Sequence, residues 1–144
     1  MFNIIFKLDN FLSAQDCNYF IKHFNNNIDH TTPFRDRIVL KYKNDQIIEK
    51  LNSMITFFNF KNIDNMEIVK WPEGSVLAPH YDDGDFLTFI IILNDDFEGG
   101  ESVIENIEIK PKLGDLIIFS NGLYLHEVKK ITKGERFVLI AWYK

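Results

Sequence analysis

The segment MEIVKWPEGSVLAPHYDDGDFLTFIIILNDDFEGGES, residues 66–102, consists of three short apolar runs separated by turn-forming residues. The runs cover residues 66–70, 76–81 and 86–93 and are rich in β-branched and aromatic side chains. Runs of this length and composition are typical of strands. The breaks that follow them are Pro72-Glu73-Gly74, Asp82-Asp83-Gly84-Asp85 and Glu98-Gly99-Gly100. Because such clusters of Pro, Gly and Asp favour turns, the segment predicts successive antiparallel strands.

The same pattern continues to the end of the chain. Further runs occupy residues 102–104, 107–109, 115–119, 123–128 and 136–142. About eight short strands with no helical period among them predict an antiparallel double-stranded β-helix, or jelly roll. We expect residues 123–128 and 136–142 to form a hairpin closed by residues 129–135.

Residues before this region have a helical pattern. Ser13 is placed to cap a helix over residues 13–24. The apolar stripe of this helix is Cys17, Phe20, Ile21 and Phe24. A second stripe predicts a helix over residues 45–58, because apolar side chains recur there at helical spacing.

Between the helices, residues 37–42 are predicted to form a strand and residues 25–33 a polar loop. The expected fold is therefore α+β, a jelly roll with N-terminal helices packed on the outside of one sheet. We expect a single domain over residues 1–144, with a helical support region at 1–65 and the jelly-roll core at 66–144.

The overall composition excludes several classes of protein. The chain has 144 residues, is 46% apolar and carries a net charge of −5, so a basic nucleic-acid-binding face is not expected. No apolar run approaches the ~20 residues of a membrane helix. Cys17 is the only cysteine, which fits a reducing compartment, and we expect a cytoplasmic protein. Lysine outnumbers arginine thirteen to three, a bias typical of an AT-rich coding sequence such as that of a virus.

A metal-ligating pattern begins at His80-Tyr81-Asp82 and continues at His126. Alternation places His80 and Asp82 on one face of a strand, and a second strand can bring His126 beside them. Two imidazoles and one carboxylate on one face of an iron are the ligands of non-heme Fe(II) oxygenases. The three-residue motif alone is weak, since a surface hydrogen-bonded pair has the same sequence.

Arg136 strengthens the metal interpretation. It lies ten residues after His126 and, by alternation, shares an inward face with Val138, Ile140 and Trp142. Burial of an unpaired guanidinium would cost several kcal/mol. The distal carboxylate of a dicarboxylate ligand would supply a bidentate partner.

An ordered set of motifs resembles the prolyl-4-hydroxylase-like branch of the Fe(II)/2-oxoglutarate-dependent dioxygenases. The matching segments are 71–74, 79–82, 88–94, 97–102, 111–119, His126 and 134–142, together with 9–13 and the first helix. The resemblance implies a hydroxylase that uses Fe(II), 2-oxoglutarate and O2, with ascorbate as a reductant.

The resemblance also implies roles for individual residues. His80, Asp82 and His126 would ligate iron, and Arg136 would bind the C5 carboxylate of 2-oxoglutarate. Trp71 would be either a core residue or part of the co-substrate wall. On the substrate side, the expected residues are Trp142, Leu77 and Asp85.

The substrate remains open at this point. By resemblance it is a protein or peptide side chain, with proline as the first choice, and Asp85 near the mouth would favour basic flanks. Leu77, Ile92 and Trp71 stand at positions where the family often has tyrosine. The alternatives are a free amino acid or other small molecule, nucleic-acid demethylation, or a non-enzymatic cupin-type module that binds a metal or sugar.

Overall fold

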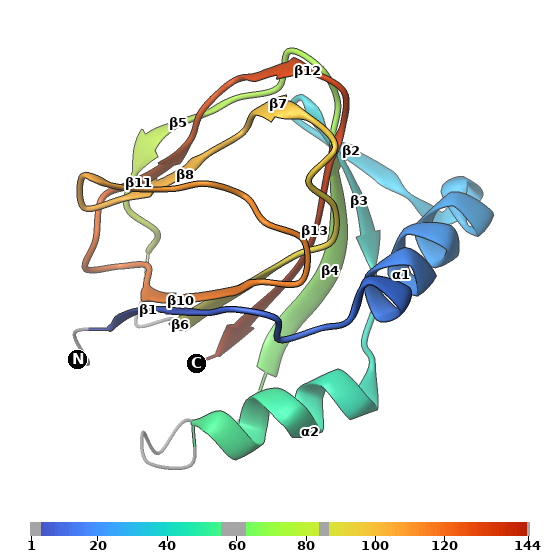
Figure 1. The fold of residues 1–144 in the computed structure, drawn as a ribbon, viewed down its shortest axis with the longest axis horizontal. Helices are drawn as coiled ribbons and strands as arrows, with labels where there is room; N and C mark the ends of the chain where they lie inside the picture. Colours follow the sequence, from blue (N-terminus) through green and yellow to red (C-terminus); the bar gives the residue numbers. More distant parts are fainter. Residues whose placement is uncertain (1–3, 56–62, 84–86, 144) are drawn as a thin grey trace.

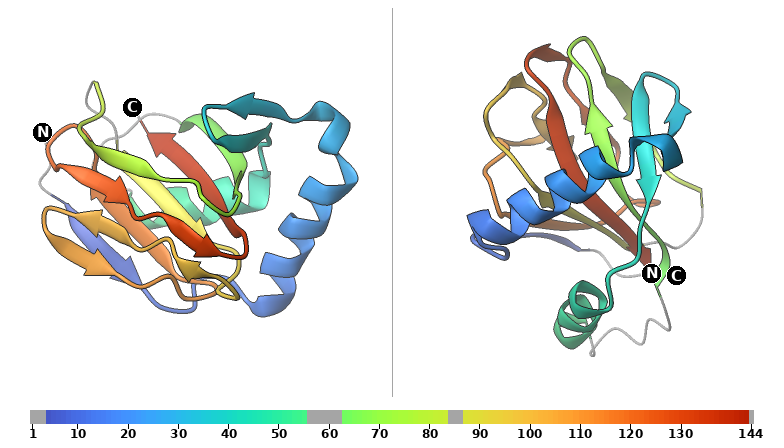
Figure 2. Two further views of the ribbon diagram at one scale, coloured as in Figure 1. Left: turned by 90° about the horizontal axis from the view of Figure 1, so that it is seen from above. Right: turned by 90° about the vertical axis from the view of Figure 1, so that its right-hand side faces the viewer.

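A computed structural model describes residues 4–55, 63–83 and 87–143 of the chain. Over these ranges two β-sheets face each other, and two helices cover the outer side of the larger sheet (Figures 1 and 2). The predicted α+β jelly roll is confirmed.

The larger sheet has seven strands and the smaller sheet has four. The larger sheet runs β1 (Ile5–Leu8), β10 (Leu116–Ser120), β6 (Leu87–Ile92), β13 (Arg136–Tyr143), β4 (Ile63–Trp71), β3 (Arg37–Lys41) and β2 (Thr32–Phe34). The smaller sheet runs β5 (Leu77–His80), β11 (His126–Val128), β8 (Ser102–Ile104) and β9 (Ile107–Ile109). A short ribbon pairs β12 (Ile131–Lys133) with β7 (Glu98–Gly99).

Helix α1 (Ala14–Asn26) begins where the sequence predicts. The Ser13 hydroxyl accepts a hydrogen bond from the Asp16 amide at 3.1 Å, which satisfies one free N–H of the first turn. Cys17, Phe20 and Phe24 are buried against the larger sheet. The stripe therefore docks the helix as expected.

Helix α2 (Asp45–Met54) is shorter than predicted. Asn44 caps its start, and the Ile55 amide donates to the Asn52 carbonyl where the helix ends. Residues 56–58 of the predicted helix lie outside the described ranges. A turn of 3₁₀ helix, η1 (Ile28–His30), follows α1. Within the described ranges, neither α-helix is long and apolar enough to cross a membrane.

Alternation along β13 divides the core into two layers. Phe137, Leu139 and Ala141 pack in the cluster that contains the helices. Val138 belongs to the cluster between the two sheets. The side of the larger sheet that faces the smaller one therefore forms the inside of the barrel.

Two strands near the N-terminus were not predicted. β1 pairs with β10, and β2, which begins inside the region 25–33 predicted as a loop, pairs with β3. Both lie at the edges of the larger sheet. An edge position tolerates Pro33, whose missing N–H would interrupt a central strand. Within the described ranges, residues 1–65 thus contribute β1, β2, β3 and the start of β4 as well as helices.

The predicted hairpin between residues 123–128 and 136–142 is wrong. β11 lies in the smaller sheet and β13 in the larger one, so the connecting segment crosses between the sheets. Within it, β12 pairs with β7. Gly99 has a φ of 78°, and a Cβ there would lie 2.1 Å from the Lys130 carbonyl oxygen. Close backbone contact at this glycine holds the crossing segment.

Candidate active site

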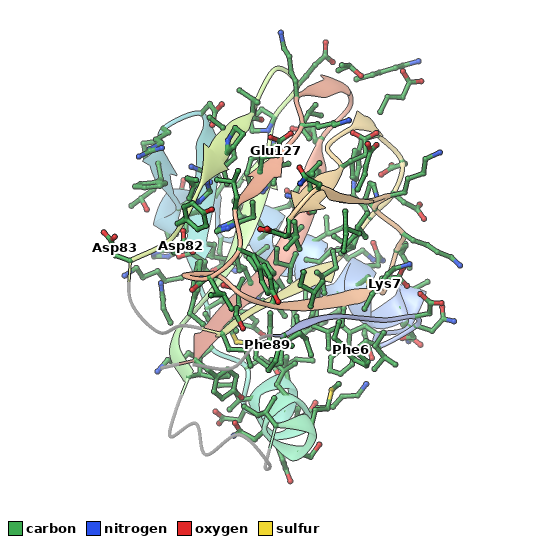
Figure 3. The ribbon with its side chains drawn as sticks, turned by 90° about the vertical axis from the view of Figure 1, so that its left-hand side faces the viewer. Phe6, Lys7, Asp82, Asp83, Phe89 and Glu127 are labelled. Carbon is green, nitrogen blue, oxygen red and sulfur yellow. The ribbon has the colours of Figure 1, made fainter. Side chains whose placement is uncertain are left out.

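His80 and His126 are direct cross-strand neighbours in the smaller sheet. His80 ends β5, His126 begins β11, and the antiparallel register pairs them. Asp82 follows in the turn, where its amide donates to the Asn121 carbonyl at 3.1 Å. In Figure 3, Asp82 lies against the strands whereas Asp83 points away from the protein body. The sheet register thus brings together the three residues that the sequence singled out.

The three side chains converge on one point. Asp82 Oδ1 lies 3.1 Å from His80 Nε2 and 3.5 Å from His126 Nε2. The possible ligand atoms of the three residues all lie within 4.8 Å of one another. Such a set of two imidazole nitrogens and one carboxylate oxygen suits Fe(II).

Backbone carbonyls orient both imidazole rings. His80 Nδ1 lies 2.9 Å from the Ala78 carbonyl oxygen, and His126 Nδ1 lies 2.9 Å from that of Tyr124. A carbonyl accepts only, so each Nδ1 carries a proton, and each Nε2 turns toward Asp82. Ligating histidines are commonly held in this way by their second nitrogen. With both Nε2 atoms facing a carboxylate, the site is arranged for a cation.

The electrostatics of Asp82 support the same conclusion. Partial burial would by itself raise the pKa of this carboxyl, but the His126 hydrogen bond and the charges of His126 and His80 lower it below its ordinary value. Asp82 is therefore held as a carboxylate, the form that binds a metal.

Arg136 is a charged side chain buried deep in the described core. It is 1% exposed, and its Nη2 donates to the Ser102 hydroxyl at 3.3 Å. Its Nε finds no hydrogen-bond partner among the described residues. Burial, and next the charge of Arg37, lower the pKa of Arg136 to about 9. A buried guanidinium with one long hydrogen bond is incompletely satisfied, and an anionic ligand would satisfy it.

Ser102, which accepts a hydrogen bond from Arg136, is offset from the His126 position by two residues along the smaller sheet. Val128 pairs with Ser102, the partner of Arg136, whereas His126 pairs with Ile104. Two residues of strand correspond to about 6–7 Å. A short dicarboxylate can therefore reach Arg136 with one end and a metal at His126 with the other.

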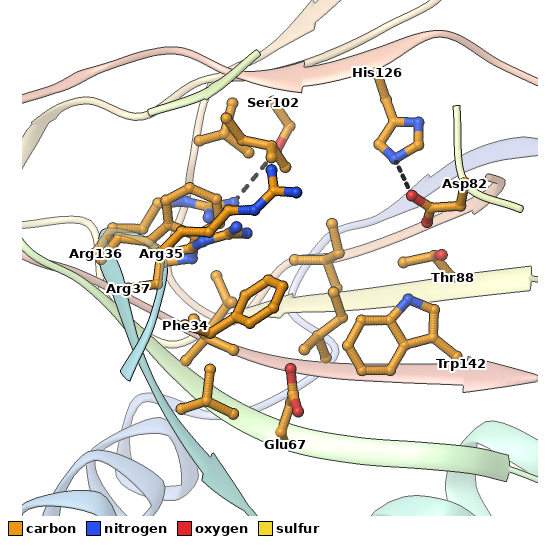
Figure 4. Close-up of a pocket in the computed structure, with 18 of the residues that line it drawn as sticks. Phe34, Arg35, Arg37, Glu67, Asp82, Thr88, Ser102, His126, Arg136 and Trp142 are labelled. Carbon is orange, nitrogen blue, oxygen red and sulfur yellow. Dashed lines mark hydrogen bonds and ion pairs between the residues drawn. The ribbon is translucent and has the colours of Figure 1, made fainter. Parts of the chain in front are cut away.

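Both features line one cavity of about 540 Å³ between the sheets. Figure 4 shows the arginine side chains gathered at one end, with His126 and Asp82 at the other. The apolar part of the wall includes Val39, Val69, Leu77, Ile90, Ile104, Phe119, Val128, Val138 and Ile140. A cavity of this volume is usual for a small-molecule site.

The other residues expected at the site have mixed outcomes. Trp71, Trp142 and Leu77 line the cavity. Trp71 is 5% exposed, and its indole N–H lacks a hydrogen-bond partner among the described residues. It is thus both a core residue and part of the cavity wall. Asp85 lies outside the described residues.

Several polar residues of the cavity were not recognised in the sequence, among them Ser102, Glu67 and Arg37. Arg37 lies on β3, next to the strand β4 that carries Trp71. Its guanidinium lies 4.7 Å from the Trp71 ring centre. Arg136 pairs with Trp71 from the other side, at 5.0 Å. Trp71 therefore has a guanidinium from each neighbouring strand. The alternation of Arg37, Val39 and Lys41 is a sequence signal that could have indicated this inward face.

Residues 66–144 match the family model of the 2OG-Fe(II) oxygenase superfamily, which is more than half of the chain. The chain belongs to the 2OG-Fe(II) oxygenase superfamily. Membership implies Fe(II), 2-oxoglutarate and O2. The oxygenase has residues that fit these groups, namely a two-histidine, one-carboxylate donor set and a buried arginine with an unpaired Nε.

Relatives of this oxygenase include hydroxylases. A PKHD-type hydroxylase from Prochlorococcus marinus strain MIT 9515 is 35% identical over 88 residues, which are 57% of this chain and 38% of that protein. Human prolyl 3-hydroxylase 2 is 40% identical over 62 residues, which are 38% of this chain and 9% of that protein. The matches span well under two thirds of either relative.

The fold of the oxygenase is also that of a solved prolyl hydroxylase. The crystal structure of a prolyl-4-hydroxylase from Pseudomonas putida superposes with a TM-score of 0.84 at 17% identity, covering 99% of this chain and 92% of that one. At this identity the likeness establishes the jelly roll with its outer helices.

Proposed function

We propose that this oxygenase hydroxylates a protein or peptide side chain, with proline as the preferred target. In this proposal His80, Asp82 and His126 bind Fe(II), and Arg136 binds the distal carboxylate of 2-oxoglutarate. The observation that carries it is the buried, incompletely paired Arg136, which shares one cavity with the three convergent ligand groups. A cupin-type binding module would have no use for this arginine.

The residues of the chain would divide the work. Bound Fe(II) and 2-oxoglutarate would supply the oxidation, in which O2 oxidises 2-oxoglutarate to succinate and CO2 and one oxygen atom enters the substrate. The Ala78 and Tyr124 carbonyls hold the imidazoles in one tautomer. Ser102 holds the Arg136 guanidinium, and the apolar walls exclude water from the reacting end of the cavity.

Support for a proline substrate comes from the relatives. Their names include prolyl 3-hydroxylase and prolyl-4-hydroxylase. Ascorbate would keep the iron reduced between turnovers. The lone cysteine, Cys17, is buried and free, in keeping with a protein of the cytoplasm. The preference for basic flanks depends on Asp85, whereas the described part of the cavity has several cationic side chains.

The test is turnover with a panel of peptides and amino acids. The protein is incubated with Fe(II), 2-oxoglutarate, ascorbate and air, and succinate and the mass of each candidate substrate are measured. We expect slow succinate formation without substrate, faster formation with proline-containing peptides, and a product heavier by one oxygen atom. His126→Ala should form no succinate. If the native protein forms none in any arm, the proposed function is wrong.

A small free amino acid is the second candidate, because the cavity has the size of a small-molecule site. Free L-proline in the same panel tests it. Stimulation by L-proline and by no peptide would replace the peptide proposal with this one.

A further inference from the structure

All three arginines of the chain line the same cavity, although the protein carries a net charge of −5. Arg136 has a role in the proposed function. Arg35 and Arg37 have no role in it. Both belong to the hairpin formed by β2 and β3 at the edge of the larger sheet.

The hairpin forms a compact cationic rim around an aromatic ring. Phe34 pairs with Arg37, which leaves Arg35 and Asp36 as the two-residue turn. The guanidinium carbons of Arg35 and Arg37 lie 5.6 and 5.3 Å from the Phe34 ring centre. Figure 4 shows Phe34 extending into the cavity beneath the arginines, and the residue is 56% exposed. A ligand that enters the cavity here would meet one apolar surface and two cations.

The cations of this rim are only partly neutralised. Asp36 is the acid of the hairpin, and its Oδ2 accepts the Val76 amide at 2.9 Å. Its Oδ1 lies 3.7 Å from Arg37 Nε, which is longer than a hydrogen bond. That Nε is buried and has no hydrogen-bond partner among the described residues. Arg35 makes no hydrogen bond or ion pair to any residue that the structure describes, so the rim has a surplus positive charge.

The acids elsewhere on the cavity wall do not cancel this surplus. Glu67 is the cross-strand partner of Lys41. Lys41 ends β3, at the opposite end of the strand from Arg37. Asp82 belongs to the metal-ligating cluster, and Glu127 lies between His126 and Val128 on β11 of the smaller sheet. The distal carboxylate of 2-oxoglutarate is accounted for by Arg136. The rim arginines are therefore available for a different anion.

We propose that Arg35 and Arg37 bind a carboxylate of the primary substrate, with Phe34 packing against the adjacent apolar part of that substrate. This inference rests on the proposed function and specifies its substrate class as acidic. A guanidinium pair matches a carboxylate in charge and in hydrogen-bond geometry. The carboxylate belongs either to an acidic side chain next to the modified residue or to the α-carboxylate of a C-terminal or free amino acid.

The test compares matched ligands without turnover. The protein is loaded with Mn(II) and 2-oxoglutarate under anaerobic conditions, and ligand binding is measured by calorimetry. The pairs are capped peptides with Pro-Glu or Pro-Gln, peptides ending in proline as the free acid or the amide, and L-proline or L-prolinamide. The first pair tests a side-chain carboxylate, and the other two test an α-carboxylate.

In at least one pair the acid should bind about fivefold more tightly than its neutral partner, and the ratio should fall as salt is added. The double variant R35Q/R37Q should bring the ratio to about one. Lys112→Gln, which removes an exposed cation outside the cavity wall, should leave the ratio unchanged.

Several outcomes would overturn the inference. Equal binding within every pair, or no binding of any ligand by protein that binds 2-oxoglutarate, would refute it and leave the proposed iron chemistry intact. If R37Q weakens 2-oxoglutarate binding and preserves the acid-to-neutral ratio, Arg37 serves the co-substrate instead. Failure of the native protein to bind Mn(II) and 2-oxoglutarate would count against the proposed function itself.

Discussion

Arg136 and Trp71 are direct cross-strand partners in β13 and β4, and the guanidinium lies 5.0 Å from the indole ring centre. The Ser102 hydroxyl is the hydrogen-bond partner of Arg136 within the described structure. The indole face and one hydroxyl compensate a fully buried cation only in part. Arg136 therefore destabilises the ligand-free protein, and it would stabilise a bound anion.

Replacing Arg136 by Met tests this cost. Burial lowers the pKa of Arg136 to about 9, well below its ordinary value, so its charge is retained at neutral pH and destabilises the folded state, and this cost is relieved only as the pH rises above 9. Arg136→Met should raise the stability of the ligand-free protein by about 1–2 kcal/mol, or about 3–6 °C in Tm. Calorimetric or fluorescence melting measures this.

The same variant should lose its response to the co-substrate. 2-Oxoglutarate with Mn(II) should raise the Tm of the native protein, because a ligand that binds only the folded state stabilises it. Arg136→Met should show no rise beyond that caused by Mn(II) alone. A lower Tm without ligand, or an unchanged response to 2-oxoglutarate, would contradict the role given to this residue.

Trp71 should report co-substrate binding by its fluorescence. The chain has two tryptophans, Trp71 and Trp142, so each single Phe variant leaves one reporter. In Trp142→Phe, 2-oxoglutarate should change the emission, because its carboxylate would enter beside the guanidinium that stacks on Trp71. In Trp71→Phe the response should be much smaller, and the affinity for 2-oxoglutarate should fall about fivefold, or ~1 kcal/mol. Equal responses in the two variants would refute this placement of the co-substrate.

Part of this structure follows from sequence pattern and part does not. The runs of the jelly roll and the cap at Ser13 are local signals, and they predicted the elements well. β1 and β2 are short edge strands whose pairing depends on distant partners, and so they were missed. The crossing from β11 to β13 was predicted as a hairpin because adjacent runs usually pair.

The candidate site divides in the same way. His80, Asp82, His126 and Arg136 stand at a spacing that the sequence makes visible. The contact of Arg37 with Trp71 depends on the register between β3 and β4, which no local pattern specifies. Cross-strand partners distant in sequence thus accounted for most of what was missed.

Cys17 offers a test of how α1 docks on the sheet. The thiol is fully buried, its Sγ lies 3.8 Å from the Ile92 carbonyl oxygen, and burial raises its pKa to about 11. In native protein at pH 8 a thiol reagent should therefore react only at the rate at which α1 opens. Denatured protein should react at once. Rapid labelling of the native thiol would show that α1 is not docked as described.

Glu67 should make the fold sensitive to pH. Burial raises its pKa, and the Asn65 hydrogen bond and the charges of Lys41 and Arg37 oppose that rise only in part. The folded state thus holds this proton to a higher pH than the unfolded state does. Its stabilising effect is complete below the ordinary value of 4.5 and is lost as the pH rises through the raised pKa.

Glu67→Gln isolates this contribution. Denaturant unfolding of the native and variant proteins is measured from acid to neutral pH, and the difference between the two curves is compared. The variant should gain relative stability as the pH rises, and it should be the more stable protein at pH 7. A difference independent of pH would show that Glu67 titrates alike in the folded and unfolded states.

The most direct test of the metal centre is an anaerobic Fe(II) titration followed by 2-oxoglutarate. The native protein should bind one Fe(II) per chain and then develop a visible charge-transfer band when 2-oxoglutarate is added. His126→Ala should bind little iron and give no band, whereas Arg136→Met should bind iron normally and need far more 2-oxoglutarate for the band. If the native protein binds no iron, or if His126→Ala binds it as tightly as the native protein does, the assignment of His80, Asp82 and His126 as the iron site is wrong.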